Sequence, residues 1–318
     1  MRPMPGSSTS VAGGLFDRAA QLFRDLQTDI CRALAAADGG AMFSTDVWSR
    51  EGGGGGVSRV LEEGAVFEKA GVNWSGVDGE LPADYAKQLP GEGTSFRATG
   101  VSLVLHPRSP MIPTTHANFR FLAKGDAAWF GGGADLTPYY LWREDAAHFH
   151  RVFADACDRH RPIGDYDRFK TWCDDYFFLP HRGETRGVGG IFFDYVGATE
   201  HDPERVLDFV RDAGSAFLSA YLPIVERRRH EPWGDAERTW QLRRRGRYVE
   251  FNLIHDRGTV FGLKTGGRTE SILMSLPPLV RWDYQVQPPT GSREAELVAA
   301  LVKGTDWLGR NGGAAGLR

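Results

Sequence analysis

Residues 102–140 decide the fold, and they read SLVLHPRSPMIPTTHANFRFLAKGDAAWFGGGADLTPYY. Apolar residues alternate with other types on both sides of a proline-rich stretch, which is typical of two β-strands that each bury one face. Proline has no backbone N–H to donate to a sheet, so Pro107, Pro110 and Pro113 predict a stiff connecting loop. The segment therefore predicts two strands that pair as a hairpin.

Chemically active side chains gather on this predicted hairpin. His106 and His116 bracket the proline loop, and Arg120 shares a strand face with His116 because side chains alternate with a period of two. Three glycines at 131–133 favour a turn in which the backbone approaches another group closely, and Asp135 follows them. The plain alternative for Asp135 is an Asx-turn that only shapes the chain. Two histidines, an arginine and an aspartate around one glycine-rich turn indicate a functional site.

The amino-acid composition limits the classes of protein to which this chain could belong. Of the 318 residues, 41% are hydrophobic and 25% are charged, which is ordinary for a globular protein. A net charge of −3 gives no long-range attraction to nucleic acid, and no apolar run approaches the roughly 20 residues of a membrane-spanning helix. Cys31, Cys157 and Cys173 form no C-x-x-C pair, which argues against a disulfide framework or a structural zinc site. We therefore expect a protein of the reducing cytoplasm.

The rest of the chain predicts an α+β fold around an antiparallel sheet. Helical periodicity or helix-start signals mark segments at 15–36, 142–160, 165–178, from 202 onward, and 292–301. Strand patterns mark a hairpin at 57–73, a strand at 189–195, and strands at 248–255 and 259–264 joined by a tight turn at Asp256-Arg257-Gly258. The sequence shows no internal repeat or linker. We expect one domain over 1–318, with flexible tails at 1–12 and 311–318.

Long motifs along the chain point to one family. They are HPRSPMIPTTHANFR at 106–120, WFGGGADLTPYYL at 129–141, VFEKAGVNWS at 66–75, WCDDYFFLPHR at 172–182, RGVGGIFFD at 186–194 and YVEFNLIHDRGTVFGLKTGGRTESILMSLPP at 248–278. In this order and spacing the sequence resembles the oxygen-dependent coproporphyrinogen III oxidases. The resemblance implies a large antiparallel β-sheet flanked by helical layers on both faces. It also implies a homodimer whose contact includes C-terminal strands around 248–283.

The resemblance also implies a reaction. Enzymes of this family convert two propionate side chains of coproporphyrinogen III to vinyl groups, giving protoporphyrinogen IX and two CO2 in haem and porphyrin biosynthesis. O2 is the co-substrate, and no organic cofactor is needed because the reduced tetrapyrrole can itself react with O2. This agrees with the lack of a nucleotide-binding motif in the sequence. The protein's task would then be to position the substrate and to place charge around it.

Several positions match the family's functional residues. The resemblance implies catalytic roles for His116 as a proton donor, for Asp135 as the essential acid, and for Arg257. It implies substrate-binding roles for Ser102, Asn118, Phe119, Arg120, Gly266, Gly267 and Arg268. Arginine forks suit propionate carboxylates, and an ionised Asp135 would accept hydrogen bonds from the pyrrole N–H groups at the ring centre. Tyr195 stands where the family often has a second aspartate, and we predict no role for it.

A divalent metal is a further expectation from the family. Its ligands would be His106, His116, His150 and His181, although no local spacing among them is typical of a metal site. Two other functions stay open at this point. A non-haem iron oxygenase would use two histidines and a carboxylate such as Asp135. A tetrapyrrole carrier would bind the same ligand without turnover, and CO2 release from coproporphyrinogen would distinguish it from an enzyme.

Overall fold

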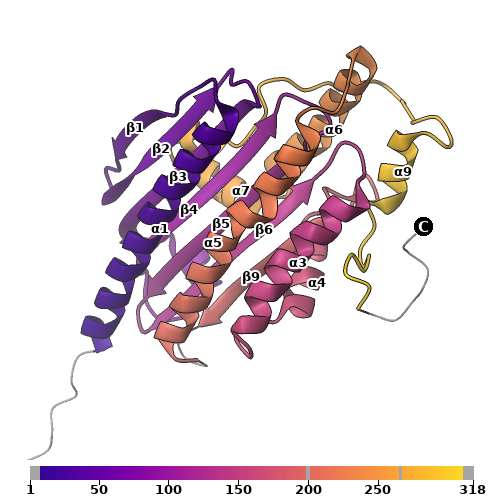
Figure 1. The fold of residues 1–318 in the computed structure, drawn as a ribbon. Helices are drawn as coiled ribbons and strands as arrows, with labels where there is room; N and C mark the ends of the chain where they lie inside the picture. Colours follow the sequence, from indigo (N-terminus) through magenta and orange to yellow (C-terminus); the bar gives the residue numbers. More distant parts are fainter. Residues whose placement is uncertain (1–7, 198–200, 265–266, 311–318) are drawn as a thin grey trace, which may run out of the picture.

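The structure is a computed structural model, and it describes residues 8–197, 201–264 and 267–310. The tails expected at 1–7 and 311–318 lie outside the described residues. Residues 8–12 were expected in a tail, but they begin a helix. The described chain forms a large antiparallel sheet with helices on both faces, which confirms the predicted α+β class (Figure 1).

Seven strands of the described chain form the main sheet, in the order β1-β2-β3-β4-β5-β6-β9, and each pairs antiparallel with its neighbours. Their bounds are β1 (Ser44–Ser49), β2 (Gly54–Glu62), β3 (Phe67–Glu80), β4 (Ser95–Pro107), β5 (Thr114–Lys124), β6 (Ala127–Thr137) and β9 (Gly189–Gly197). The short strands β7 (Phe178–Leu179) and β8 (Glu184–Thr185) pair with each other. The predicted hairpin is therefore confirmed as β4 and β5.

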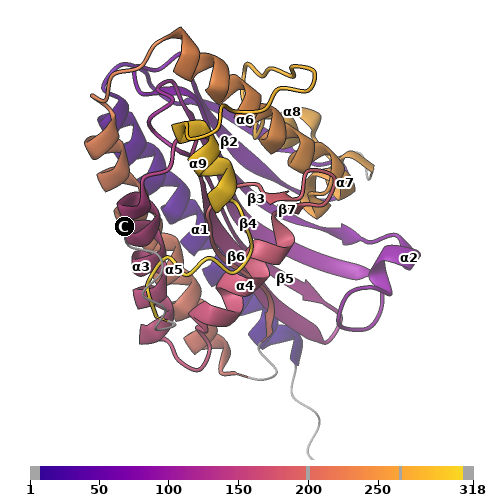
Figure 2. The same cartoon turned by 90° about the vertical axis from the view of Figure 1, so that its right-hand side faces the viewer.

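Two helical layers enclose the sheet. One layer consists of α1 (Ser8–Asp38), α3 (Arg143–Arg159) and α5 (Pro203–Arg228), which lie in front of the strands in Figure 1. Figure 2 shows the second layer on the other side: α6 (Asp235–Ile254), α7 (Arg257–Lys264) and α8 (Thr269–Leu273). The helix α4 (Tyr166–Tyr176) packs against β9 at the edge of the sheet. The short helices α2 (Ala83–Ala86) and α9 (Arg293–Ala300) lie at the periphery. The predicted helices at 15–36, 142–160, 165–178, from 202 onward and 292–301 are confirmed as parts of α1, α3, α4, α5 and α9.

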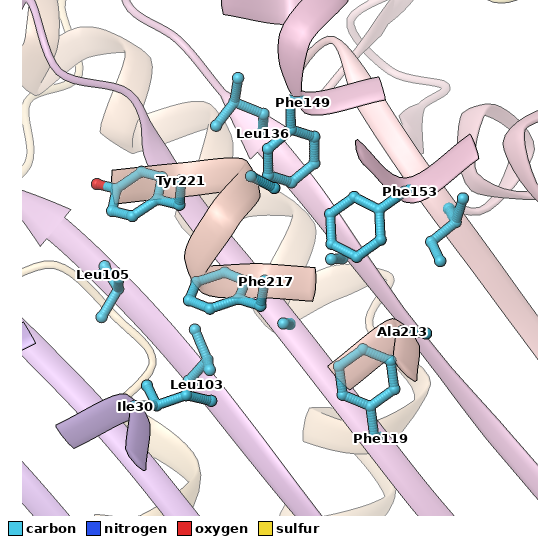
Figure 3. Close-up of a cluster of buried hydrophobic side chains, with 14 of the residues drawn as sticks. Ile30, Leu103, Leu105, Phe119, Leu136, Phe149, Phe153, Ala213, Phe217 and Tyr221 are labelled. Carbon is cyan, nitrogen blue, oxygen red and sulfur yellow. The ribbon is translucent and has the colours of Figure 1, made fainter. Parts of the chain in front are cut away.

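The apolar face of the sheet packs under the first helical layer. Leu103 and Leu105 of β4 and Phe119 of β5 are at most 2% exposed and share one core cluster with Phe217 and Tyr221 of α5. In Figure 3, Leu103 and Leu105 lie near Phe217, and Phe119 lies beside Ala213 of α5. These strand residues are two apart because successive side chains point to opposite faces. The alternate positions, which include His116 and Arg120, must therefore lie on the other face. The sequence pattern of the hairpin separates a core from a polar surface.

The three glycines at 131–133 lie inside β6, so the predicted glycine-rich turn was wrong. Close contact with the neighbouring strands explains why glycine occupies these positions. A Cβ at Gly133 would lie 2.4 Å from the backbone oxygen of Ile191, and one at Gly132 would lie 2.8 Å from that of Asn118. A larger residue at either position would push the strands apart. The glycines are therefore a packing requirement of the sheet centre.

The strands predicted at 248–255 and 259–264 are also wrong, because these residues belong to α6 and α7. Valine, tyrosine and phenylalanine favour strands, but Tyr248 and Phe251 are three apart and both buried, as on one face of a helix. The predicted turn at 256–258 is a helix start. The Asp256 carboxylate accepts the backbone N–H of Thr259 at 2.7 Å, as an N-cap does.

A single carboxylate joins α1 to the β2–β3 turn. Asp38, which is 2% exposed, accepts backbone N–H groups of Val66 and Phe67 at 2.8 and 2.9 Å, and of Ala41 and Ala65 at 3.0 Å. Burial alone would raise the pKa of Asp38, but these N–H groups favour the ionised form and hold the pKa below its usual value. The ionised carboxylate therefore stabilises the fold.

We predict that Asp38→Asn lowers the free energy of unfolding by roughly 2–3 kcal/mol at neutral pH, because an amide donor would face other donors. Urea denaturation measures the loss. The folded-state pKa is lowered, so the contribution of Asp38 is present above its unfolded pKa of about 4 and lost as the pH falls through the folded value. The difference between wild type and variant should shrink in acid. Asp29→Asn on the exposed side of α1 is the control, and an equal loss there would contradict the account.

Candidate active site

Polar side chains of the central strands lie on the face opposite the apolar core. In the strand register His116 pairs with Asp135, and Ser102 pairs with Asn118. Arg120 lies two residues beyond Asn118 and so shares its face. Because α6, α7 and α8 cover this side of the sheet (Figure 2), these strand positions face the second helical layer. The strands β4, β5 and β6 thus place Ser102, His116, Asn118, Arg120 and Asp135 on one face of the sheet.

A buried group of polar contacts on this face centres on Asp135. The His116 Nδ1–H donates to Asp135 Oδ1 at 2.8 Å, and Arg186 Nη2 donates to both carboxylate oxygens at 2.9 and 2.8 Å. Arg186 Nη1 donates to Asn252 Oδ1 of α6 at 2.8 Å. Asp135 and Arg186 side chains are each 2% exposed, whereas the His116 side chain is 20% exposed. The histidine is therefore the member of this group that can meet a ligand.

The environment keeps the Asp135 carboxylate ionised. Burial alone would raise its pKa, but the Arg186 guanidinium and the hydrogen bond from His116 lower it below the usual value. An ionised carboxylate accepts only, so it fixes the proton of His116 on Nδ1 and leaves Nε2 on the far side of the ring. The pair resembles the arrangement in which an acid orients a histidine for proton transfer.

Asp135 does not lie where we expected it. At 2% exposure and with contacts on both oxygens, it cannot face the N–H groups of a ligand without breaking its bonds to Arg186 and His116. The Asx-turn alternative is also wrong, since Asp135 lies within β6. Sequence reasoning assigned no role to Arg186, which is 51 residues away from Asp135. Its only sequence signal was its place at the start of the RGVGGIFFD motif.

A second ion pair lies on the same face and is more open. Arg120 Nη2 donates to Asp194 Oδ2 of β9 at 2.7 Å, and Arg120 Nη1 donates to Asn118 Oδ1 at 2.8 Å. The Arg120 and Asp194 side chains are 27% and 15% exposed. Sequence reasoning predicted Arg120 but missed Asp194. The period of two along β9 could have placed Asp194 on the same face as Phe192.

Aromatic rings form a wall beside these charges. Phe192 of β9 stacks on Tyr176 of α4 with ring centroids 4.2 Å apart, and Trp172 meets Phe192 edge-on at 5.6 Å. Arg257, which we predicted as catalytic, lies exposed at the start of α7 with its guanidinium carbon 5.2 Å from the Tyr176 ring centroid. The face therefore combines arginines with a flat apolar surface, as a ligand with carboxylates around an apolar ring requires.

The remaining predicted binding residues do not all reach this face. Arg268, at the start of α8, donates to Ser271 Oγ at 3.0 Å and also pairs with Asp46 of β1. The Gly267 N–H already donates to the Gly262 oxygen at 2.8 Å, so it is not a free donor for a carboxylate. Gly266 lies outside the described residues. The Phe119 ring lies in the apolar core on the opposite face of the sheet (Figure 3).

The four histidines of the expected metal site do not fit a shared ion. His106 contacts Thr114 Oγ1 and the Ser275 oxygen, and His150 contacts the Tyr166 hydroxyl and the Val188 oxygen. His181 contacts Glu250 and His255, while His116 contacts Asp135. Burial lowers the pKa of His150 to about 3 and that of His106 well below its usual value. Within the described ranges, histidine, cysteine, aspartate and glutamate side chains form no group of three that could hold a metal ion.

A comparison with protein families finds one match that spans the sequence motifs. The family model described as coproporphyrinogen III oxidase matches residues 18–307, which is most of the chain. Among the helices that the structure describes, none is long and apolar enough to cross a membrane. His116, Arg120, Asp135 and Asp194 lie within the matched range. The chain therefore belongs to the coproporphyrinogen III oxidase family, whose reaction is the oxidative decarboxylation of coproporphyrinogen III in haem biosynthesis.

Proposed function

We propose that this chain catalyses the oxygen-dependent form of the family's reaction and gives protoporphyrinogen IX. In each of two steps, a propionate loses its carboxyl group as CO2, one hydrogen as a proton and two electrons, and a vinyl group forms. O2 accepts the two electrons with two protons and leaves as hydrogen peroxide. The observation that carries the proposal is a histidine hydrogen-bonded to a buried carboxylate, beside arginines and an aromatic wall. This combination suits proton transfer on an apolar polycarboxylate.

The described side chains suggest distinct roles. His116 would exchange a proton with the substrate at Nε2, while Asp135 would act as a positioning residue that holds the ring through Nδ1. Arg120 and Arg257 would bind propionate carboxylates through charge-assisted hydrogen bonds. Phe192 and Tyr176 would pack against the tetrapyrrole and exclude water. No step of this scheme is assigned to a metal, because the four expected ligands lie apart and have other partners.

The direct test is a matched pair of assays with purified protein and coproporphyrinogen III, one in air and one under nitrogen. We expect two CO2 per substrate in air and none under nitrogen, with activity unaffected by a strong chelator. His116→Gln should lower kcat by about 10²–10⁴-fold because it removes the proton-transfer group. His148→Gln on α3, outside the site, is the control and should keep full activity.

CO2 release under nitrogen would contradict the oxygen-dependent assignment. Binding of coproporphyrinogen without CO2 release in air would identify the chain as a carrier instead. Loss of activity on chelation, restored by one metal alone, would contradict the metal-free scheme. Cys31, Cys157 and Cys173 are buried free thiols, and this supports our placement of the reaction in a reducing compartment such as the cytoplasm.

We also propose that the protein is a homodimer, with a contact that includes residues 248–283 as helices and loops rather than strands. Large apolar side chains are exposed in and next to this segment: Leu253, Ile254, Leu279, Trp282 and Tyr284. Tyr284 is 90% exposed and Ile254 is 58% exposed, and such a concentration of apolar surface is typical of protein contacts. A second copy of the chain would cover these side chains.

We predict that Ile254→Glu converts the dimer to a monomer, because a charge would have to be buried at the contact. Sedimentation velocity at micromolar concentration measures the change. Val302→Glu is a matched control, since Val302 is 53% exposed but lies outside this segment. A wild-type protein that sediments as a monomer would remove the proposal, and an unchanged dimer in Ile254→Glu would place the contact elsewhere.

A further inference from the structure

Tyr195 of β9 has an unusual backbone conformation. Its φ is 54°, a left-handed value that is unfavourable for a residue with a large side chain. Three non-glycine residues of the described chain have a positive φ, and the other two, Glu63 and Gln285, lie outside the strands. A residue keeps such a conformation where the surrounding structure imposes it, and these positions cluster at functional sites. The backbone therefore indicates that the direction of the Tyr195 side chain matters.

A β-bulge gives the Tyr195 side chain its direction. The strand β9 places two residues, Asp194 and Tyr195, opposite the single Gly131 of β6. In a regular strand, neighbouring side chains point to opposite faces of the sheet. Here both reach the polar face: Asp194 pairs with Arg120, and the Tyr195 ring centroid lies 5.8 Å from that of Trp129. Trp129 shares the face of Gly131, the strand partner of Arg120, because it lies two positions away.

The Tyr195 side chain is open to a ligand. Tyr195 is 41% exposed, whereas its neighbour Trp129 is 3% exposed. On the other side of Asp194 along β9, the Phe192 ring centroid lies 6.0 Å from the guanidinium carbon of Arg120. The ion pair of Arg120 and Asp194 thus has an aromatic residue on each side along the strand. A flat apolar ligand that contacts both rings would place a carboxylate near Arg120.

We propose that Tyr195 is a substrate-binding residue of this chain, whose ring packs against the apolar macrocycle and forms a second wall on the other side of the ion pair from Phe192. The inference rests on the proposed function. Sequence reasoning assigned no role to Tyr195, because alternation reveals neither the bulge nor the left-handed backbone. A tyrosine that only meets solvent needs neither of these features. Contact with Trp129 fixes the ring without covering it, and the hydroxyl group has no part in this role.

Tyr195→Gly removes the ring and keeps the backbone. Glycine adopts a φ of 54° without strain and retains the N–H that donates to Asp194 Oδ1 at 3.0 Å. Assays in air with coproporphyrinogen III measure kcat and KM. We expect KM to rise about tenfold, the effect of losing one aromatic contact, while kcat keeps its wild-type value because the bound substrate and the transition state touch the ring equally. Tyr195→Phe keeps the ring and should keep the wild-type KM.

Glu63→Gly is the matched control, since Glu63 has a φ of 55° between β2 and β3, outside the site, and this variant should leave KM unchanged. If circular dichroism shows that Tyr195→Gly does not fold, Tyr195→Asn gives the same test, because asparagine also tolerates a left-handed backbone. An unchanged KM without the ring, or an equal rise in Tyr195→Phe, would overturn the proposal. A fall in kcat at constant KM would also overturn it, because Tyr195 would then act only by aiming Asp194. Wild-type protein that releases no CO2 from coproporphyrinogen would instead reject the proposed function.

Discussion

The buried ion pair between Asp135 and Arg186 organises the polar side of this structure. Arg186 follows β8, its guanidinium carbon lies 4.1 Å from the Phe177 ring centroid and 4.5 Å from that of Tyr248, and it also bonds Asn252 of α6. One contact thus joins β6 to α6 and to the segment before β9. Removing either partner of such a pair typically costs about 3–5 kcal/mol, because a charge is left buried and unpaired. The same pair sets the tautomer of His116, so stability and chemistry depend on the same contact.

The two faces of the sheet have different roles: one forms the core and the other carries the candidate site. The face under α1, α3 and α5 is packed with aliphatic and aromatic side chains and keeps the strands in register. On the opposite face the polar side chains differ in exposure: Asp135 is buried, whereas His116 and Arg120 are partly exposed. Solvent screens the electrostatic interactions of the charges in this site less than those of fully exposed charges, because aromatic rings lie beside them. A rigid core behind a polar face suits an enzyme whose task is positioning.

The sequence predicted the parts of this arrangement that depend on local pattern. The alternation around His116 predicted the hairpin and placed His116 and Arg120 on one face. Alternation depends only on neighbouring positions in the chain, so it can be recognised without knowing which strands pair. The end of α6 was predicted as a strand, since its β-favouring residues Tyr248 and Phe251 are buried by packing against Arg186. Asp135 was expected to face the substrate because its partner Arg186, which lies 51 residues away in the chain, was not recognised. The pairing of Asp194 with Arg120 was missed because the two residues lie 74 positions apart in the chain.

The central claim is that Asp135 acts through His116 and does not itself face the substrate. Long-range proton–nitrogen correlation NMR on protein with isotope-labelled histidine tests it, because the nitrogen shifts distinguish the two neutral tautomers. At mildly alkaline pH, where an ordinary imidazole is neutral, the account predicts that His116 carries its proton on Nδ1 and leaves Nε2 unprotonated. It also predicts that Asp135→Ala abolishes this preference. A His116 signal with the proton on Nε2 in the wild-type protein would contradict the account.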